Sequence, residues 1–251
     1  MFDWPVMDPL FYGVAIPAVL LLGLSKSGFA SGFGSMAVPL MAMAVSVPTA
    51  AAILMPILLV LDILGLRAYR KDIDKALLRW LVPCSLAGVF LGYLSFKSLD
   101  TQTVSAIVGA STLLFLAQRI FWPSAKLLSQ PSQRTGVVLS IASGFTSFMA
   151  HAGAPPINAY LLGLNLAPIR FASTLAVLFF WVNLVKWIPY AGLGLLHTGN
   201  MLTALTLMPF APIGIYVGVY LTKRMRPTVF YRLVHGAMFL TGCKLLWDGL
   251  S

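Results

Sequence analysis

The sequence predicts an all-α polytopic membrane protein, and three observations support this fold class. Of its 251 residues, 59% are hydrophobic and 10% are charged, and the mean hydropathy is +0.89. Because a soluble domain carries about 25% charged residues, this chain lacks the charge to cover a water-facing surface. Apolar runs fill most of its length, and at about 20 residues per span they predict about eight to ten transmembrane segments and no soluble domain.

Most of the apolar runs predict full transmembrane helices, at 10–25, 49–66, 77–96, 103–121, 135–150, 168–188, 201–222 and 228–247. Two runs, 35–47 and 155–166, are shorter, at about 12 residues or roughly 18 Å of helix each. Each follows a break rich in glycine and serine, the first at 25–34 and the second at 143–153. Irregular backbone at membrane depth is tolerated only where protein or a water-filled cavity covers it, so we expect both breaks to line a site. Each short segment either crosses the bilayer or returns as the arm of a re-entrant hairpin.

The two breaks belong to an internal repeat. Gly28-Phe-Ala-Ser31 in the first break matches Gly144-Phe-Thr-Ser147 in the second. Four later positions also match in register between the halves: Pro83, Gly88, Gly92 and Lys97 correspond to Pro209, Gly214, Gly218 and Lys223. The sequence therefore predicts two membrane domains related by duplication, 1–130 and 131–251. The paired glycines are interpreted as helix contacts.

Basic residues predict the topology. They gather in the loops around 67–79, 119–134 and 223–232, whereas the N-terminus and the alternate loops are poor in them. The positive-inside rule places the three basic loops in the cytoplasm and both termini outside. The first half then starts outside and the second inside, which makes the repeats inverted, as in many secondary transporters. These loops account for the net charge of +10, so we expect no nucleic-acid partner.

The polar residues of the breaks predict a site for a small anion. Helices beginning at Ser35 and near Pro155 would present free N–H groups and positive dipole ends to it. Lys26 would supply a full charge, since a lysine deep in a membrane segment costs about 3 kcal/mol; the alternative is that it snorkels to the interface. The predicted substrate-binding residues are Lys26, Ser27, Gly28, Ser31, Gly34, Ser35, Ser147, His151, Gly153 and Asn158.

Four residues are candidates for coupling or gating: His151, Asp62, Asn183 and Lys186. His151 is a candidate proton switch, with a hydrogen-bonded packing histidine as the alternative. We expect Asp62 to pair with the cytoplasmic basic cluster, or else with a buried lysine, and Asn183 to be its polar counterpart in the second half. Lys186 lies just before a proline, and we expect it to snorkel to the outer end of its helix.

The sequence does not predict an enzyme. It has seven acidic residues, and it lacks paired carboxylates, metal-ligand spacing, a P-loop and a serine hydrolase motif. We therefore expect no catalytic residue, no metal ligand and no cofactor, and transport driven by an existing gradient. An anion channel with the same pore and a membrane-embedded assembly protein remain alternatives.

Two stretches resemble a known family. Lys26-Ser-Gly-Phe through Gly34 to Val38-Pro-Leu40 is similar to the first-repeat signature of the TauE/SafE sulfite exporter family, and Phe148 to Pro156 to its second. Asn183 to Tyr190 resembles one branch of that family, and the resemblance covers about residues 10 to 250.

The resemblance implies a multi-pass transporter of the bacterial inner membrane, and the basic loops then place both termini in the periplasm. It implies transport of a small sulfur-containing anion, sulfite or an organosulfonate, with export expected and import as the alternative. We expect the mechanism to be alternating access. Carriage of another organic anion, such as a carboxylate, is an alternative. The expected partners are this anion, the lipid bilayer and protons, the last through His151.

Overall fold

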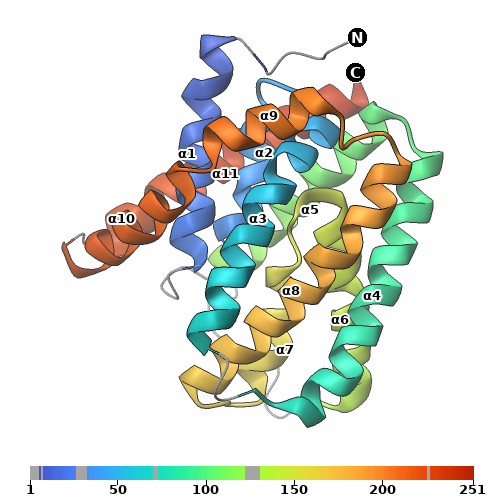
Figure 1. The fold of residues 1–251 in the computed structure, drawn as a ribbon, viewed down its shortest axis with the longest axis vertical. Coiled ribbons are helices and arrows are strands. Elements are labelled where there is room, and N and C mark those ends of the chain that lie inside the picture. Colours follow the sequence, from blue (N-terminus) through green and yellow to red (C-terminus); the bar gives the residue numbers. More distant parts are fainter. Residues whose placement is uncertain (1–5, 7, 27–32, 70–72, 122–130, 225–226) are drawn as a thin grey trace.

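The protein is mainly helical in the part that the structure, a computed structural model, describes: residues 6, 8–26, 33–69, 73–121, 131–224 and 227–251. No strand occurs in these ranges (Figure 1). The elements of the first half are α1 (Pro9–Lys26), a 3₁₀ turn η1 (Phe33–Met36), α2 (Ala37–Met41), α3 (Val47–Tyr69), α4 (Lys75–Ser98) and α5 (Thr101–Phe121). Those of the second half are α6 (Gln133–Ala150), α7 (Ala154–Gly163), α8 (Pro168–Gly192), α9 (Thr198–Leu207), α10 (Phe210–Arg224) and α11 (Pro227–Leu250).

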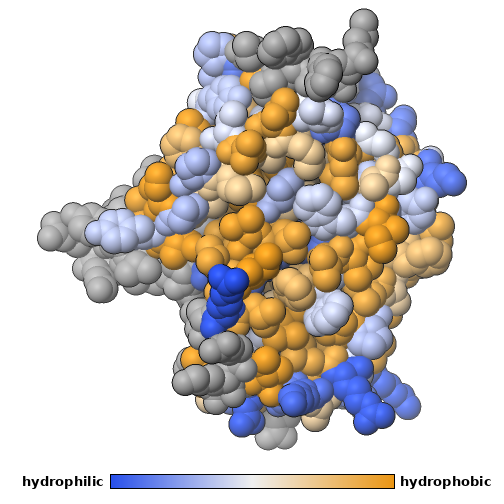
Figure 2. All heavy atoms as spheres, viewed as in Figure 1, coloured by the Kyte–Doolittle hydropathy of each residue, from blue (hydrophilic) through white to orange (hydrophobic). Residues whose placement is uncertain are grey.

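The surface of the bundle confirms the predicted class of an all-α membrane protein. Five stretches of the described chain are long and apolar enough to cross a bilayer: Pro9–Lys26, Val47–Arg67, Lys75–Ser98, Ile169–Gly192 and Thr198–Val217. Large apolar side chains face outward on many helices. Figure 2 shows mostly hydrophobic groups over the middle of the molecule and strongly hydrophilic ones along its lower edge. Such a belt suits a lipid environment.

The predicted span 201–222 is wrong in one respect, because the structure divides it into α9 and α10. The division falls at Met208 and Pro209. A proline inside a helix removes one hydrogen-bond donor and clashes with the carbonyl four residues earlier. The sequence analysis used Pro209 only as a repeat marker and so overlooked its effect on the helix.

The first short segment is also shorter than predicted. In place of a helix over 35–47, the structure has η1, the five-residue α2 and a turn at 42–46. The Ser46 hydroxyl accepts the backbone N–H of Thr49 at 3.4 Å, and Pro48 occupies the first turn of α3. These two features are typical helix-start signals, and they begin a new helix where the apolar run continues.

The second short segment returns along the helix before it. The Ser143 hydroxyl of α6 donates to the Gly153 carbonyl at the start of α7. Farther along α7, Tyr160 packs against Gly136, near the beginning of α6. The two helices therefore run antiparallel, and α6 and α7 form a hairpin whose open end lies at the lower end of the bundle in Figure 1.

The described residues on either side of the first break, which are Ser25 and Lys26 before it and Gly34 after the undescribed segment 27–32, also lie close together. Gly34 of η1 packs against Leu22 and Ser25 near the end of α1, so the chain turns back beside the helix it has just left. It then enters α3 at the upper end of the bundle in Figure 1. Helix α3 lies beside α8 in the centre, and the two run antiparallel.

Glycines set the closest helix contacts. A Cβ at Gly144 of α6 would lie 2.7 Å from the carbonyl carbon of Ser85 and 2.9 Å from the backbone N of Val89, both on α4. A Cβ at Gly23 of α1 would lie 3.0 Å from the Cα of Gly214 on α10. The backbones thus touch in both pairs, which confirms the interpretation of Gly88 and Gly214 as helix contacts.

Candidate functional site

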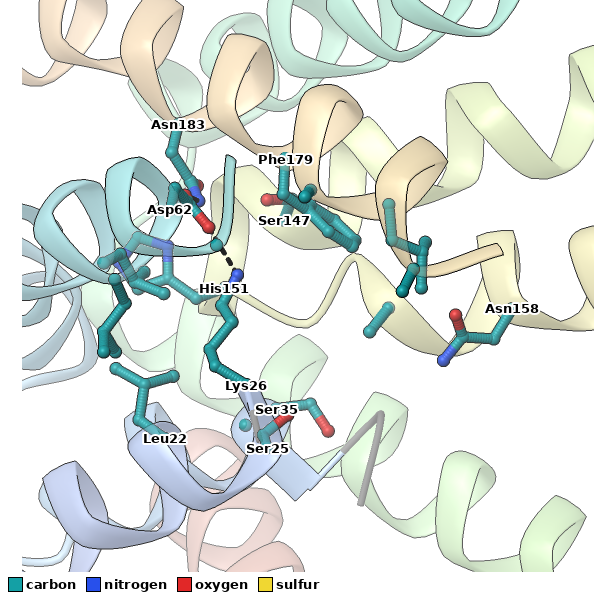
Figure 3. A pocket seen from close by; sticks show the side chains of 18 of the residues that line it. Leu22, Ser25, Lys26, Ser35, Asp62, Ser147, His151, Asn158, Phe179 and Asn183 are labelled. Carbon is teal, nitrogen blue, oxygen red and sulfur yellow. Dashed lines mark hydrogen bonds and ion pairs between the residues drawn. The ribbon is translucent and has the colours of Figure 1, made fainter. Parts of the chain in front are cut away.

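A cavity of about 540 Å³ lies where the two breaks meet. Its walls come from α1, η1, α3, the α6–α7 hairpin and α8. Figure 3 shows Lys26 of α1 pointing toward Asp62 of α3, with Ser147 and His151 of the second break beside them. Residues from both predicted breaks therefore line one cavity, which is partly open to the outside.

Most of the predicted site residues that the structure describes line this cavity. They are Lys26, Gly34, Ser35, Asp62, Ser147, His151, Asn158 and Asn183. Gly153 and Lys186 do not line it, although both lie directly behind its wall. Ser27, Gly28 and Ser31 lie outside the described residues.

Lys26, Asp62 and Asn183 form one connected group. Lys26 Nζ makes an ion pair with Asp62 Oδ1, and Asn183 Nδ2 donates to Asp62 Oδ2. Asp62 is 1% exposed, so both carboxylate oxygens are satisfied inside the protein. Of the two partners expected for Asp62, the structure has the buried lysine, and the favoured pairing with the basic cluster was wrong. Lys26 also lies over the Phe179 ring, 5.4 Å from its centre.

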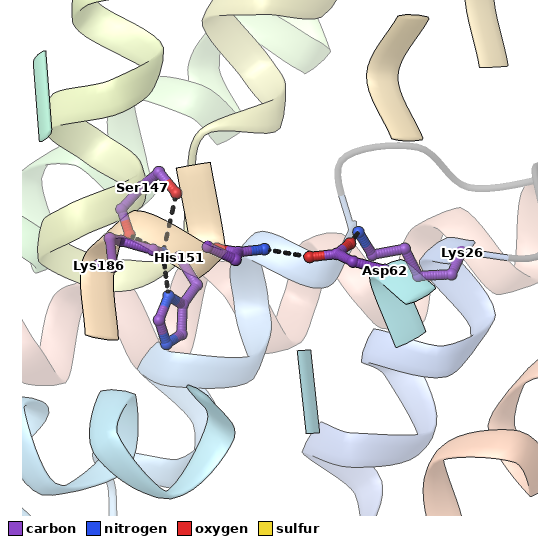
Figure 4. Close-up of polar contacts among 6 residues, drawn as sticks. Lys26, Asp62, Ser147, His151 and Lys186 are labelled. Carbon is purple, nitrogen blue, oxygen red and sulfur yellow. Dashed lines mark hydrogen bonds and ion pairs between the residues drawn. The ribbon is translucent and has the colours of Figure 1, made fainter. Parts of the chain in front are cut away.

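Lys186, Ser147 and His151 form a second group, shown in Figure 4. Lys186 Nζ donates to the Ser147 carbonyl at 2.9 Å, to the Ser147 hydroxyl at 3.1 Å and to His151 Nδ1 at 2.8 Å. Lys186 is fully buried. The prediction that it snorkels was wrong because α8 runs past Pro189 to Gly192, which leaves Lys186 well inside the bundle.

The carbonyl groups of the second break are satisfied by side chains. Ser143 bonds the Gly153 carbonyl at 2.6 Å and Thr146 bonds the Ala152 carbonyl at 2.9 Å. The Tyr190 hydroxyl donates to the Phe148 carbonyl at 2.8 Å. Since lipid offers no hydrogen bonds, this internal pairing is what allows an open backbone at membrane depth.

His151 ends α6 in a left-handed conformation, with φ 52° and ψ 25°. Glycine usually occupies this position, because it has no Cβ to crowd the backbone. Here the side chain compensates: one ring nitrogen contacts Lys186 and the other, Nε2, lies 2.8 Å from the Ala51 carbonyl of α3. A non-glycine residue held in this region is typical of functional sites.

The helix starts contribute less to an anion site than the sequence predicts. Ser35 lies within η1, and the residue before α2 is Met36, which makes no side-chain cap. Helix α7 begins one residue before Pro155, close to the predicted start. However, Pro155 and Pro156 have no N–H, so only part of its first turn can donate.

Ser25 adds one more hydroxyl group to the cavity wall. The remaining lining residues are not polar, and the sequence analysis did not single them out: Leu22, Leu58, Leu61, Gly65, Ala154, Ile169, Phe171, Ala172, Leu175, Ala176 and Phe179. The buried Asn158 Oδ1, on α7, has no hydrogen-bond partner among the residues that the structure describes. The cavity therefore offers polar groups to a solute at separate places on an apolar wall. Spacing along α8 is the one sequence signal for these residues, since 172, 175, 176, 179 and 183 share one helix face.

No group of three or more potential metal-binding side chains occurs in the described part of the chain. The polar side chains at the cavity are mainly hydrogen-bond donors, and its one carboxylate is already paired. Donors of this kind suit a negatively charged solute.

Comparison with known proteins gives one match. The model of the family described as "Sulfite exporter TauE/SafE" matches residues 15–245. No curated protein and no solved structure matches the chain.

Proposed function

The chain belongs to the TauE/SafE sulfite exporter family, and from this premise we propose that it exports sulfite or an organosulfonate by alternating access. Family and fold together make it a multi-pass membrane transporter of sulfur-containing anions. What we propose beyond the family is the substrate, the direction of transport and the mechanism. A gradient of ions or of the substrate itself drives the transport.

One observation carries the proposal: both breaks border a single cavity that excess positive charge surrounds. Within the described part of the chain, two lysines, Lys26 and Lys186, lie at or behind its wall, against one carboxylate, that of Asp62. A small anion entering this hollow would find hydroxyl and amide groups from Ser147, Asn158 and Asn183. Binding at the interface of two halves is the arrangement that rocking carriers use.

The helix contacts support two inverted repeats, 1–130 and 131–251. In the first half, Gly23 touches the backbone of Ala211 and Ile215, and in the second, Gly144 touches that of Ser85 and Val89. The spacing between the two contacted residues is the same in both pairs. The central helices α3 and α8, which occupy matching places in the halves, run antiparallel, as inversion requires.

The charge distribution supports the predicted orientation in a bacterial inner membrane. Exposed basic residues occupy the end of the bundle where α3 ends and where α4, α6 and α8 begin: Arg67, Lys75, Arg79, Arg134 and Arg170. By the positive-inside rule this end faces the cytoplasm and the N-terminus faces the periplasm. The first hairpin then enters from the periplasm and the second from the cytoplasm.

Reconstituted protein tests the proposal. Purified protein is first screened by thermal shift against sulfite, thiosulfate, sulfoacetate, taurine, methanesulfonate and simple carboxylates, because a ligand that binds the folded state raises the melting temperature. We expect stabilisation by sulfite or a sulfonate, and uptake into proteoliposomes that internal substrate accelerates. Exchange of this kind distinguishes a carrier from a channel. Stabilisation by carboxylates alone, or flux without exchange, would contradict the proposal.

A proton is the proposed coupling ion, and His151 is its proposed carrier. At low pH a proton on His151 adds positive charge beside the cavity, so anion uptake should rise as the pH falls. We expect His151→Gln to flatten this dependence over the pH range in which uptake by the wild type changes, with the exposed His197→Gln as a matched control. The measurement is initial uptake into proteoliposomes across that range. A His151→Gln profile that follows the wild type would assign the proton to another group.

A further inference from the structure

The charges at the cavity do not cancel. Lys26 and Asp62 neutralise each other in a direct ion pair, and Asn183 holds the second carboxylate oxygen. Lys26 therefore has little net charge to offer a solute. Lys186 is the other lysine at the site, and it is fully buried.

Neutral groups surround Lys186. Its three contacts are the carbonyl and hydroxyl oxygens of Ser147 and the Nδ1 atom of His151. Among the described residues, no carboxylate forms an ion pair with it. Three acceptors around Nζ match the three N–H donors of an ammonium group. A buried ammonium group without a direct counter-charge is stabilised by an anion that binds nearby.

The hydrogen bonds define the protonation of His151. The Ala51 carbonyl can only accept, so Nε2, at 2.8 Å from it, carries the ring hydrogen. Nδ1 then has a free lone pair and accepts from Lys186. His151 is thus neutral in this arrangement, and it adds no charge of its own.

Ser147 connects Lys186 to the cavity. Its hydroxyl oxygen accepts a hydrogen bond from Lys186 at 3.1 Å, and the residue lines the cavity. Because the oxygen already accepts, the hydroxyl hydrogen is free to donate to a solute. A hydroxyl polarised by an adjacent ammonium group is a stronger donor than an isolated one.

We propose that Lys186, acting through Ser147, supplies the unpaired positive charge that makes the cavity bind anions, whereas the charge of Lys26 is neutralised by Asp62. This inference rests on the proposed function and deepens it, because it specifies the charge of the substrate. One excess positive charge is balanced by one negative charge. The site therefore favours monovalent anions, such as a sulfonate or hydrogen sulfite, over divalent ones such as sulfate.

Four variants with different net charge at the site test this inference. Lys186→Met removes the excess charge, and Lys26→Met combined with Asp62→Asn keeps it. Lys186→Met combined with Asp62→Asn restores it through Lys26, and Asp62→Asn alone adds a second positive charge. Binding of methanesulfonate and of sulfate is measured by titration calorimetry on each purified variant, with the melting temperature as the check on folding.

We expect Lys186→Met to weaken methanesulfonate binding by about 100-fold, in line with the loss of a buried charge partner. The Lys26→Met/Asp62→Asn variant should weaken it far less, and Lys186→Met/Asp62→Asn should recover about tenfold over Lys186→Met. The wild type should bind methanesulfonate more tightly than sulfate, and Asp62→Asn alone should shift that preference toward sulfate.

The opposite pattern would overturn the inference. If Lys26→Met/Asp62→Asn abolishes binding while Lys186→Met retains it, Lys26 is the ligand. If Lys186→Met does not fold, the comparison of Lys26→Met/Asp62→Asn with the wild type still decides between the two lysines. A wild-type protein that binds neither methanesulfonate nor hydrogen sulfite would instead refute the proposed function.

Discussion

Replacing Lys26 with methionine should destabilise the protein by about 3 to 5 kcal/mol, the typical cost of removing one partner of a buried ion pair. Asp62 is buried on α3, and its only cationic contact among the described residues is Lys26. Without that contact, a carboxylate remains inside the bundle with Asn183 as its one partner. Unfolding of the purified variant by denaturant in mild detergent measures the loss.

A second substitution distinguishes charge from packing in this prediction. Combining Lys26→Met with Asp62→Asn removes both charges, so most of the lost stability should return. Lys97→Met makes the same chemical change at an exposed site and should alter stability by less than about 0.5 kcal/mol. A Lys26→Met protein as stable as the wild type would show that the ion pair contributes nothing to the folded state.

Gly144→Ala should destabilise the protein by about 3 kcal/mol, at the upper end of the usual cost of overpacking. The added methyl group would overlap the carbonyl of Ser85 and lie 2.9 Å from the backbone N of Val89. Backbone atoms cannot rotate away from the methyl group as a side chain can. Helices α4 and α6 would therefore have to separate. The melting temperature in detergent and the yield of monodisperse protein report the effect.

Gly13→Ala is the matched control for this prediction. Gly13 lies within α1, and a Cβ there would meet no atom within 4 Å. Because alanine favours helix over glycine, this variant should gain about 0.5 to 1 kcal/mol. Equal loss at both glycines would mean that the α4–α6 contact is looser than the structure has it.

The sequence was sufficient to predict the class of fold, but it placed the second break too broadly. The predicted break at 143–153 is helical as far as Ala150, so the irregular backbone is confined to 151–153. Hydropathy gives the apolar segments directly, and Pro155 with Pro156 marks the start of α7 within one residue. The break residues that line the cavity, such as Lys26 and His151, stand out because polar groups are costly in a membrane segment. These signals are local, and a single sequence contains them.

The sequence was insufficient wherever the answer depends on contacts between distant segments. The choice of Lys26 over the basic cluster as partner of Asp62 requires the first hairpin to be placed against α3. The burial of Lys186 depends on α8 continuing past Pro189, and on Ser147 and His151 lying beside it. The spacing of residues along the chain indicates neither the partner of Asp62 nor the burial of Lys186.

The glycine contact between α1 and α10 has a consequence for biogenesis. Gly23 is translated 191 residues before its partner Gly214. Until then the backbone groove at Gly23 has only lipid or the insertion machinery beside it. A nascent chain that stops before α10 would therefore lack the contact at Gly23. Membrane proteases could recognise such a truncated chain by the exposed face of α1.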